Sequence, residues 1–178
     1  MKKTLIVVFA ALLFFGTAKA QILKLGVGPE LAVPSGNSSN ISSIGIGGYV
    51  KFEQEVAAKV SITETAELAT FYGKKFLNIR SQNLSYLPVK LGLKYFPSEN
   101  FYAEGQGGMA FPVNNGGKSN FTWALGIGSF VKSKSNDAQF DIGLRYQALT
   151  NTIQQTIETN NRTNFSYIAL HVGYVFGF

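Results

Sequence analysis

His171 is the one side chain of the sequence that could act as an ordinary general base at neutral pH. Hydrolytic catalysis usually needs such a base beside a nucleophile. The nearest serine before it, Ser166, lies five residues earlier and would face the opposite side of a strand. The chain has no cysteine and no clustered carboxylate loop with metal-ligand spacing. The sequence therefore predicts no catalytic residue, no cofactor-binding residue and no metal ligand, and we expect no enzyme.

A glycine-rich run, Gly105-Gln106-Gly107-Gly108, is the other local pattern that could bind a ligand. A phosphate-binding loop of this kind follows a strand and opens a helix. This run instead sits inside an alternating strand pattern, and no helix pattern follows it. It therefore gives only a weak indication of phosphate binding.

Charged residues recur at alternate positions within apolar segments. Their partners on the opposite face are Leu, Ile, Val and Phe, because side chains alternate along a strand. Five bases and four acids share the polar faces: Lys24, Lys51, Lys90, Lys94, Arg145, Glu30, Glu53, Glu104 and Asp141. If these faces meet inside one barrel, the charges can pair with one another, and we expect Lys90, Lys94 and Arg145 to pair with Glu104 and Asp141.

Eight segments of this kind follow each other along the chain. They cover residues 23–33, 44–53, 57–72, 87–95, 101–111, 121–131, 138–147 and 164–178. The third is the least regular, because Val60 and Ile62 share a face that Glu64 breaks, and we predict a bulge near residues 63–65. The sequence predicts an all-β chain.

The connections between the segments alternate in length. The long ones cover residues 35–42, 73–85 and 150–163, and the segment 114–120 is intermediate. The short ones lie near residues 54–56, 97–100 and 132–136. Short turns on one side and long loops on the other are typical of outer-membrane barrels, whose short turns lie in the periplasm. Eight strands would bring both termini to the periplasmic side.

The first twenty residues have the pattern of a secretory signal. Lys2 and Lys3 precede eleven apolar residues, and Ala18-Lys19-Ala20 supplies a small-x-small cleavage site. Eleven residues are too few for a membrane-spanning helix, which needs about 20. We predict a cleaved signal over residues 1–20 and one mature domain over residues 21–178; an N-terminal membrane helix is the alternative.

Composition narrows the class of protein further. Removing three of the 16 basic residues with the signal leaves 13 against 10 acidic ones, a net charge of +3. The pI near 9.5 thus belongs partly to the signal and gives no reason to expect nucleic-acid binding. No apolar run of eighteen residues remains after cleavage, which excludes a helical membrane protein.

The orientation of the two faces depends on the surroundings of the barrel. A basic side chain on the lipid face near the midplane costs roughly 2–4 kcal/mol, so in a bilayer the bases must point inward. In water the opposite arrangement is acceptable. Two aromatic bands favour the membrane, as interfacial girdles. They comprise Phe52, Tyr95, Phe101, Phe176 and Phe178 near the short turns, and Tyr72, Phe111, Phe121, Trp123 and Tyr146 near the long loops.

Four segments carry a resemblance to a known family. "YLPVKLGLKYF" (86–96), "FYAEGQGGMAF" (101–111), "DIGLRYQAL" (141–149) and the closing "HVGYVFGF" (171–178) resemble the OmpA/OmpX-like outer-membrane β-barrel domain family. The resemblance covers the mature chain and rests on alternation, glycines and aromatics. It implies an eight-stranded antiparallel up-and-down transmembrane β-barrel in the outer membrane of a Gram-negative cell. It also implies that the assembly machinery reads the closing strand, which ends in Phe178.

The family includes surface proteins, small pores and lipid-modifying enzymes, so the resemblance fixes no activity. We expect a non-enzymatic, monomeric protein that acts structurally or through its long outer loops, with membrane lipid and lipopolysaccharide as partners. Lys74, Lys75 and Arg80 could contact lipopolysaccharide phosphates or be a solvated basic loop. The interior could be a salt-bridged plug or a narrow ion path. The alternatives are a soluble barrel that binds an apolar ligand, and a lipid-A-modifying enzyme.

Overall fold

The computed structural model describes residues 23–76, 79–80, 82–114, 118–132, 139–153 and 163–177, with backbone alone for residues 75, 76, 79, 80, 151–153 and 163. The predicted signal over residues 1–20 and the terminal Phe178 lie outside this range. Within it, no helix is long and apolar enough to cross a membrane.

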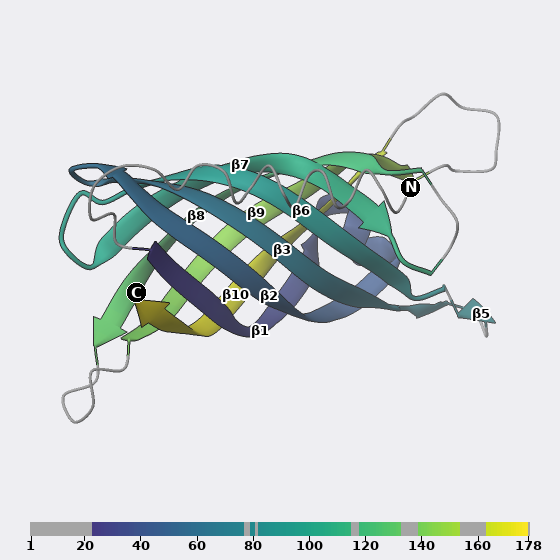
Figure 1. Ribbon diagram of the computed structural model, residues 1–178. Coiled ribbons are helices and arrows are strands. Elements are labelled where there is room, and N and C mark those ends of the chain that lie inside the picture. Colours follow the sequence, from purple (N-terminus) through teal and green to yellow (C-terminus); the bar gives the residue numbers. More distant parts are fainter. Residues whose placement is uncertain are drawn as a thin grey trace.

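The described chain is almost entirely β-strand, as the alternating segments predict (Figure 1). The strands are β1 (Leu23–Ser35), β2 (Ser42–Ala57), β3 (Val60–Gly73), β4 (Lys75–Phe76), β5 (Ile79–Arg80), β6 (Leu84–Tyr95), β7 (Phe101–Pro112), β8 (Asn120–Lys132), β9 (Gln139–Ile153) and β10 (Thr163–Gly177). A short 3-10 helix, η1 (Gly36–Asn40), follows β1.

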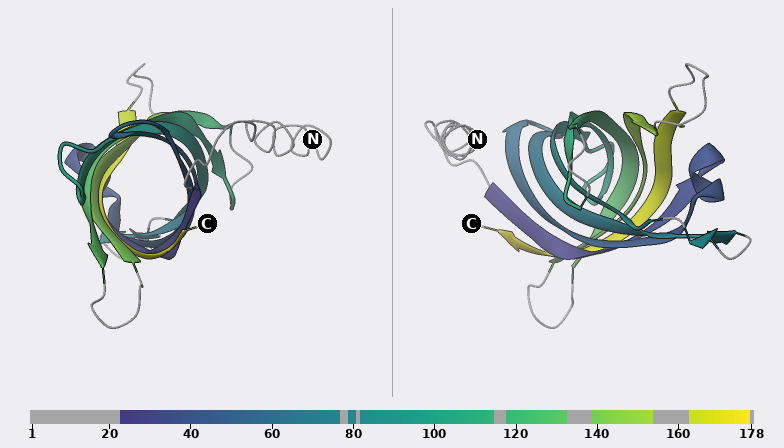
Figure 2. Two further views of the ribbon diagram at one scale, coloured as in Figure 1. Left: turned by 60° about the vertical axis from the view of Figure 1, so that its left-hand side comes forward. Right: turned by 90° about the vertical axis from the view of Figure 1, so that its right-hand side faces the viewer.

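Eight of these strands form a closed antiparallel barrel in the order β1-β10-β9-β8-β7-β6-β3-β2. Each strand pairs with its sequence neighbours in this up-and-down barrel, and β1 pairs with β10 to close it, from Lys24 opposite Gly177 to Ser35 opposite Ser166. The closed ring is visible in the left view of Figure 2. The predicted eight-stranded up-and-down barrel is confirmed.

The two ends of the barrel differ. The start of β1 and the end of β10 lie together at the left of Figure 1, at what we call the turn end. η1 and the small hairpin of β4 and β5, in which Lys75 pairs with Arg80, lie at the other end, which we call the loop end. Both elements were predicted only as parts of long loops.

The structure corrects two details of the predicted strands. The bulge predicted near residues 63–65 is wrong, because Thr63, Glu64 and Thr65 pair regularly with Glu53, Phe52 and Lys51 of β2. The turn between β2 and β3 was placed too early: β2 runs to Ala57, and Lys59 in the turn has a φ of 67°. The irregularities between β2 and β3 lie instead at the two ends of the pairing, between 42 and 45 and between 55 and 57.

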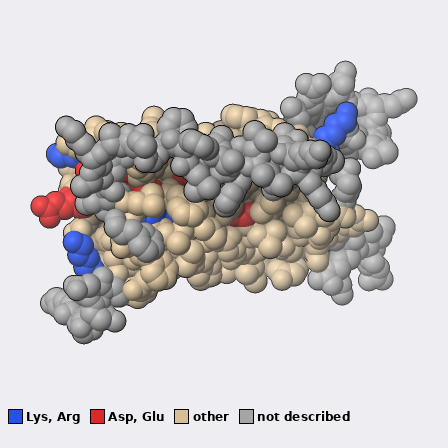
Figure 3. All heavy atoms as spheres, viewed as in Figure 1, with Lys and Arg blue, Asp and Glu red and all other residues tan. Residues whose placement is uncertain are grey.

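The two faces of the sheet have exchanged the roles they have in a water-soluble barrel. Large apolar side chains are exposed all around the outside, among them Leu91, Leu93 and Leu125, at 57%, 62% and 61% exposure. Charged side chains such as Lys90, Lys94 and Asp141 are buried inside. Figure 3 shows a belt of mostly uncharged atoms, with charged side chains gathered toward the ends. The core of this protein is therefore its polar interior.

Aromatic side chains mark the two edges of this belt on the outer surface. Trp123 of β8 packs against Tyr146 of β9 on the loop side, with ring centroids 5.6 Å apart. Tyr174 of β10 packs against Phe176 and Phe140 on the turn side, at 4.5 and 5.7 Å. Such rings at both edges suit the two interfaces of a bilayer.

Candidate functional site

The barrel interior gathers the charged residues that the sequence predicted to point inward. Alternation along the strands places them there, since each follows an outward residue, which is Pro29 before Glu30, Ala103 before Glu104 and Leu, Val or Phe before the other seven. The nine predicted residues all lie inside, namely Lys24, Lys51, Lys90, Lys94, Arg145, Glu30, Glu53, Glu104 and Asp141. Glu67 of β3 is a further acid of this interior, buried to 2% exposure, that the sequence analysis missed.

One cluster of charges lies around Arg145 of β9. Its guanidinium forms ion pairs with Glu30 of β1 and with Glu67, the latter at 2.6 Å between Nη2 and Oε1. Lys90 of β6 lies 2.6 Å from the same Glu67 Oε1 through its Nζ. The Lys90 ammonium also donates a hydrogen bond of 2.6 Å to Gln147 Oε1. Two bases and two acids thus neutralise each other in this layer.

A second cluster lies nearer the turn end. Lys51 Nζ of β2 donates to Glu104 Oε2 of β7 at 2.8 Å, and Lys94 Nζ of β6 donates to Glu53 Oε2 of β2 at 2.6 Å. Asp141 Oδ2 of β9 lies 4.0 Å from both lysine nitrogens. The cluster therefore joins β2, β6, β7 and β9 across the interior.

Uncharged side chains donate further hydrogen bonds to the carboxylates of the second cluster. Thr63 Oγ1 donates to Glu104 Oε1 at 2.6 Å, and Gln106 Nε2 donates to the same oxygen at 2.9 Å. Ser61 Oγ donates to Glu53 Oε1 at 3.3 Å. Buried carboxylates are stable only when such donors surround them. The small hydroxyl residues of β3 therefore hold the acids in place.

The predicted ion pairs are right in kind and partly wrong in partner. The sequence analysis matched Lys90, Lys94 and Arg145 with Glu104 and Asp141. Lys94 does approach Asp141, but Lys90 and Arg145 pair with Glu67, and Glu104 pairs with Lys51. The mistaken bulge on β3 hid Glu67, because its place in the alternation was lost.

An apolar cluster fills the interior at the loop end. Phe71 packs on Phe165 and on Tyr167, each at 4.8 Å between ring centroids. Tyr86 and Leu149 are buried in the same cluster. This set of five residues, which we call the loop-end lid, lies above the Arg145 cluster.

η1 packs over the same end of the barrel. Ser38 is fully buried, and its Oγ accepts a hydrogen bond of 2.8 Å from the backbone amide of Ser166. Ile41 packs against the loop-end lid, and its carbonyl accepts from the amide of Lys74 at 2.9 Å. The first long connection is thus folded against the loop-end rim of the barrel, where η1 contacts β1, β2 and β10.

A second aromatic cluster lies inside the turn end. Phe96, Tyr102 and Phe130 pack together, with centroid separations of 5.6 to 5.9 Å. We call these three residues the turn-end lid. Lys94 Nζ lies 4.0 Å from the centre of the Tyr102 ring, and Lys24 Nζ lies 4.9 Å from that of Phe130. Ammonium groups over ring faces are favourable, so this lid joins the charge network.

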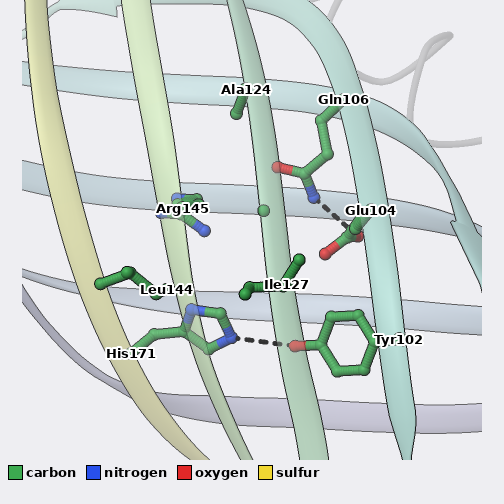
Figure 4. Close-up of a pocket in the computed structure, with 9 residues that line it drawn as sticks. Tyr102, Glu104, Gln106, Ala124, Ile127, Leu144, Arg145 and His171 are labelled. Atoms are coloured by element: carbon green, nitrogen blue, oxygen red, sulfur yellow. Dashed lines mark hydrogen bonds between the residues drawn. The ribbon is translucent and has the colours of Figure 1, made fainter.

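Two small cavities lie beside these clusters. A cavity of about 10 Å³ lies between Tyr102, Glu104, Gln106, Arg145 and His171 (Figure 4). This is room for about one water molecule. Another cavity of about 20 Å³ lies at the loop end beside Ser85 and Asn114.

His171 points inward, as the sequence predicts, and is 3% exposed. Its Nε2 lies 3.3 Å from the Tyr102 hydroxyl, which donates to Asp141 Oδ1 at 2.6 Å (Figure 4). Ser166 is not near this group, because its hydroxyl bonds that of Ser35 at 3.1 Å. A phenol, an imidazole and a carboxylate in contact could pass a proton, but the turn-end lid that contains Tyr102 covers them.

The structure also places the glycine-rich run and the basic residues of the second long loop. Gly105 to Gly108 lie within β7, and Gln106 also donates to Thr65 Oγ1 at 3.0 Å. Lys74 is exposed at the loop end and donates to the carbonyl of Ser39 at 2.7 Å. Lys75 and Arg80 belong to β4 and β5, and their side chains lie outside what the structure describes. In the described part of the chain, no group of three His, Cys, Asp or Glu could hold a metal ion.

Comparison with known proteins gives matches at the level of structure. No family model and no curated protein matches the sequence. The solved outer membrane protein OprG of Pseudomonas aeruginosa is similar at 14% identity and a TM-score of 0.57, over 90% of this chain and 97% of that one. Neisserial surface protein A is similar at 13% identity and a TM-score of 0.56, over 91% and 99%.

A third similar structure is Ail, the attachment invasion locus protein of Yersinia pestis, solved in complex with the heparin analogue sucrose octasulfate. It shares 14% identity at a TM-score of 0.53, over 89% of this chain and all of that one. These likenesses extend over the whole barrel and agree with the exposed apolar belt and the charged interior. The chain therefore has the fold of the small eight-stranded outer-membrane β-barrels, as its resemblance to the OmpA/OmpX-like family predicts.

Proposed function

We propose that this chain is an integral outer-membrane protein without catalytic activity, which acts structurally or through interactions of its outer loops. The main observation behind the proposal is that the outer surface of the barrel is apolar whereas its interior contains ten paired charges, the reverse of a water-soluble barrel. In water the belt would expose a very large apolar surface, whereas soluble monomers rarely expose patches beyond a few hundred Å². A bilayer removes this cost.

The filled interior speaks against the alternative of a soluble ligand-binding barrel. Such barrels bind apolar molecules in an open apolar cavity. Here the cavity between the charge clusters measures about 10 Å³, and charged and polar side chains surround it. This cavity gives an apolar ligand neither the volume nor the surroundings that it needs.

The same packing favours a plug over an ion path. Ion pairs cross the interior at two levels, and an aromatic lid lies beyond each of them. A conducting path would need to open both lids and separate buried ion pairs. Each buried charge left without its partner is expensive in a low-dielectric interior.

The enclosure of His171 supports a non-enzymatic role. A lipid-modifying enzyme needs its base within reach of a substrate in the bilayer or at the rim. His171, Tyr102 and Asp141 all point into the interior, and the first and last are 3% and 2% exposed. The contact among His171, Tyr102 and Asp141 therefore has a structural role in the packing of the turn end.

The loop end is the proposed surface for partners. Lys74 and Lys118 are exposed there and would meet lipopolysaccharide phosphates by simple charge attraction. The Ail structure contains a sulfated heparin analogue, and polyanions are a corresponding class of candidate ligand for this chain. We further propose that residues 1–20 are a cleaved signal and that the assembly machinery recognises β10.

Cell fractionation tests the proposal. The mature protein should sediment with outer membranes, resist extraction by high salt and carbonate, and run as a compact band on an unheated gel that shifts on boiling. Recovery in the soluble periplasm, without a heat-dependent shift, would remove the membrane assignment and favour ligand binding.

A further inference from the structure

Glu64 of β3 is out of place on the outside of the barrel. Its neighbours in the alternation, Thr63 and Thr65, are buried, whereas Glu64 is half-exposed beside the outward Ile62 and Ala66. It pairs with Phe52 on one side and with Leu91 on the other, both exposed to the surroundings. Among the described outward positions between the two aromatic edges, it is the one that carries a charge.

Strand pairing places Glu64 midway between the two edges of the belt. Pairing leads from Glu64 through Phe52 and Leu25 to Phe176, three strands away at the turn end. In the other direction it leads through Leu91 and Gly107 to Trp123, also three strands away, near the loop end. Because strands tilt in a barrel, equal numbers of steps give equal changes in height. Glu64 therefore lies near the middle of the apolar belt.

A carboxylate at that depth needs a partner. No residue of the described chain donates a hydrogen bond to Glu64 or forms an ion pair with it, although every described interior acid has such a partner. Ionisable groups in the hydrocarbon region are costly and mark sites of function. A carboxyl that keeps its proton avoids the charge, and it is then both a donor and an acceptor of hydrogen bonds.

We propose that Glu64 is the centre of a contact between two copies of this chain in the membrane. In a closed symmetric pair of copies inserted in the same direction, the two-fold axis runs along the membrane normal, so residues on the contact line meet their equivalents at the same depth. Glu64 then meets Glu64 of the partner subunit, and two protonated carboxyls satisfy each other. Among the described residues, no outward base lies between the two aromatic edges of the belt, so the second copy fits because the carboxyl group is self-complementary.

Small residues beside Glu64 allow this approach. Ala66 follows it on the outer face of β3, and Gly48 lies on β2 diagonally across from Ala66, whose pair is Val50. Small side chains let backbones come close in a membrane, where tight packing drives association. The sequence led us to expect a monomer; the outward place of Glu64 changes that expectation.

The inference rests on the proposed membrane location, and cross-linking can test the two separately. The chain has no cysteine, so Ala66→Cys introduces a single thiol beside the contact. The protein is refolded into phospholipid vesicles at low density and treated with a short bifunctional thiol reagent. Leu144→Cys is the matched control, since Leu144 is 48% exposed on β9, on the opposite wall. We expect the Ala66→Cys dimer to exceed the control several-fold.

Substitutions of Glu64 in the Ala66→Cys background identify the cause. Glu64→Gln keeps a group that both donates and accepts, and should keep most of the cross-linked dimer. Glu64→Leu should lower the yield to that of the control while the barrel still folds, because leucine suits a lipid face. Equal yields from Glu64→Leu and Glu64, or no excess over Leu144→Cys, would overturn the contact. Failure of the parent chain to enter vesicles as a heat-modifiable species would instead overturn the membrane proposal.

Discussion

Arg145 and Glu67 face each other across the full width of the barrel, with 2.6 Å between Nη2 and Oε1. Their strands, β9 and β3, are four steps apart in a ring of eight and are therefore opposite. An eight-stranded barrel is just narrow enough for side chains to span. This contact joins the opposite walls of the barrel, and Lys90 and Glu30 complete its charge balance.

Replacing Arg145 with alanine should destabilise the barrel strongly. The change leaves Glu30 and Glu67 inside with Lys90 as their only base in that cluster. Breaking a buried pair in this way costs about 3–5 kcal/mol. The free energy of unfolding can be measured by urea titration in vesicles with the fluorescence of Trp123, which is the single tryptophan and faces outward.

Lys24→Ala is the matched control for this measurement. Lys24 also forms an ion pair with an interior acid, Glu53, at 3.2 Å, but its side chain is 21% exposed at the turn end. A solvent-screened pair contributes about 1 kcal/mol or less. If the two variants lose similar stability, the Arg145 cluster is more hydrated than its burial indicates.

The plug should conduct almost no ions. In planar bilayers we expect no steady single-channel current from the parent chain, because the loop-end lid and the turn-end lid close the interior beyond the ion pairs. Arg145→Ala should leave conductance at this level, since Phe71 and Phe165 still fill the loop end. Steady channel openings whose ion selectivity changes in Arg145→Ala would contradict the plug and show that the interior is a conducting path.

Alanine substitutions at two glycines, one on the inner face of the barrel and one on the outer face, test the packing of each face separately. A Cβ at Gly128 of β8 would overlap the hydroxyl and ring of Tyr102, which is held by Asp141. Gly128→Ala should therefore cost about 1–3 kcal/mol of stability, as overpacking does. At Gly105, on the outer face, a Cβ would meet Leu125 at an ordinary 3.5 Å.

Gly105→Ala should accordingly be neutral or stabilise the barrel by about 0.5–1 kcal/mol, because alanine restricts the unfolded chain more than glycine. The same urea titration compares the two variants. A loss of stability at Gly105 equal to that at Gly128 would show that strand flexibility, and not the position of Tyr102, determines the effect.

Alternation alone predicted the barrel and the inward charges, because a period of two fixes the face of every residue in a regular strand. The exception was β3. Glu64 was read as an interruption, since a carboxyl on an outer apolar face is unexpected, and the resulting bulge removed Glu67 from the interior. The regular pairing of Thr63 and Thr65 shows that an unbroken alternation would have placed both acids correctly.

The partners of the charges could not be predicted in the same way. Which base reaches which acid depends on strand tilt and on the register of all eight strands, and no local pattern contains either. Lys51 reaches Glu104 three strands away, and Arg145 reaches Glu67 four strands away. The hairpin of β4 and β5 was missed because two-residue strands are too short to show a period.

The orientation of the barrel can be tested by labelling single cysteines on intact cells. The predicted connections give tag sites at 37–40 and 160–161 outside and at 97–100 and 133–136 inside; 160–161 and 133–136 lie outside the described residues. A tag within 37–40 would displace the buried Ser38, whereas Asn40 is exposed and tolerates a smaller probe. Asn40→Cys at the loop end is therefore paired with Ser98→Cys, which is exposed at the turn end.

With a membrane-impermeant maleimide, we expect Asn40→Cys to be labelled on intact cells and Ser98→Cys only after the outer membrane is permeabilised. The physical reason is the up-and-down topology, which places the connection before β2 and the connection before β7 at opposite ends of the barrel. The cysteine-free parent gives the background in both conditions. Labelling of Ser98→Cys but not Asn40→Cys on intact cells would mean that the barrel is inserted the other way. In that case η1 would lie at the periplasmic end of the barrel, and Lys74 and Lys118 could not meet lipopolysaccharide.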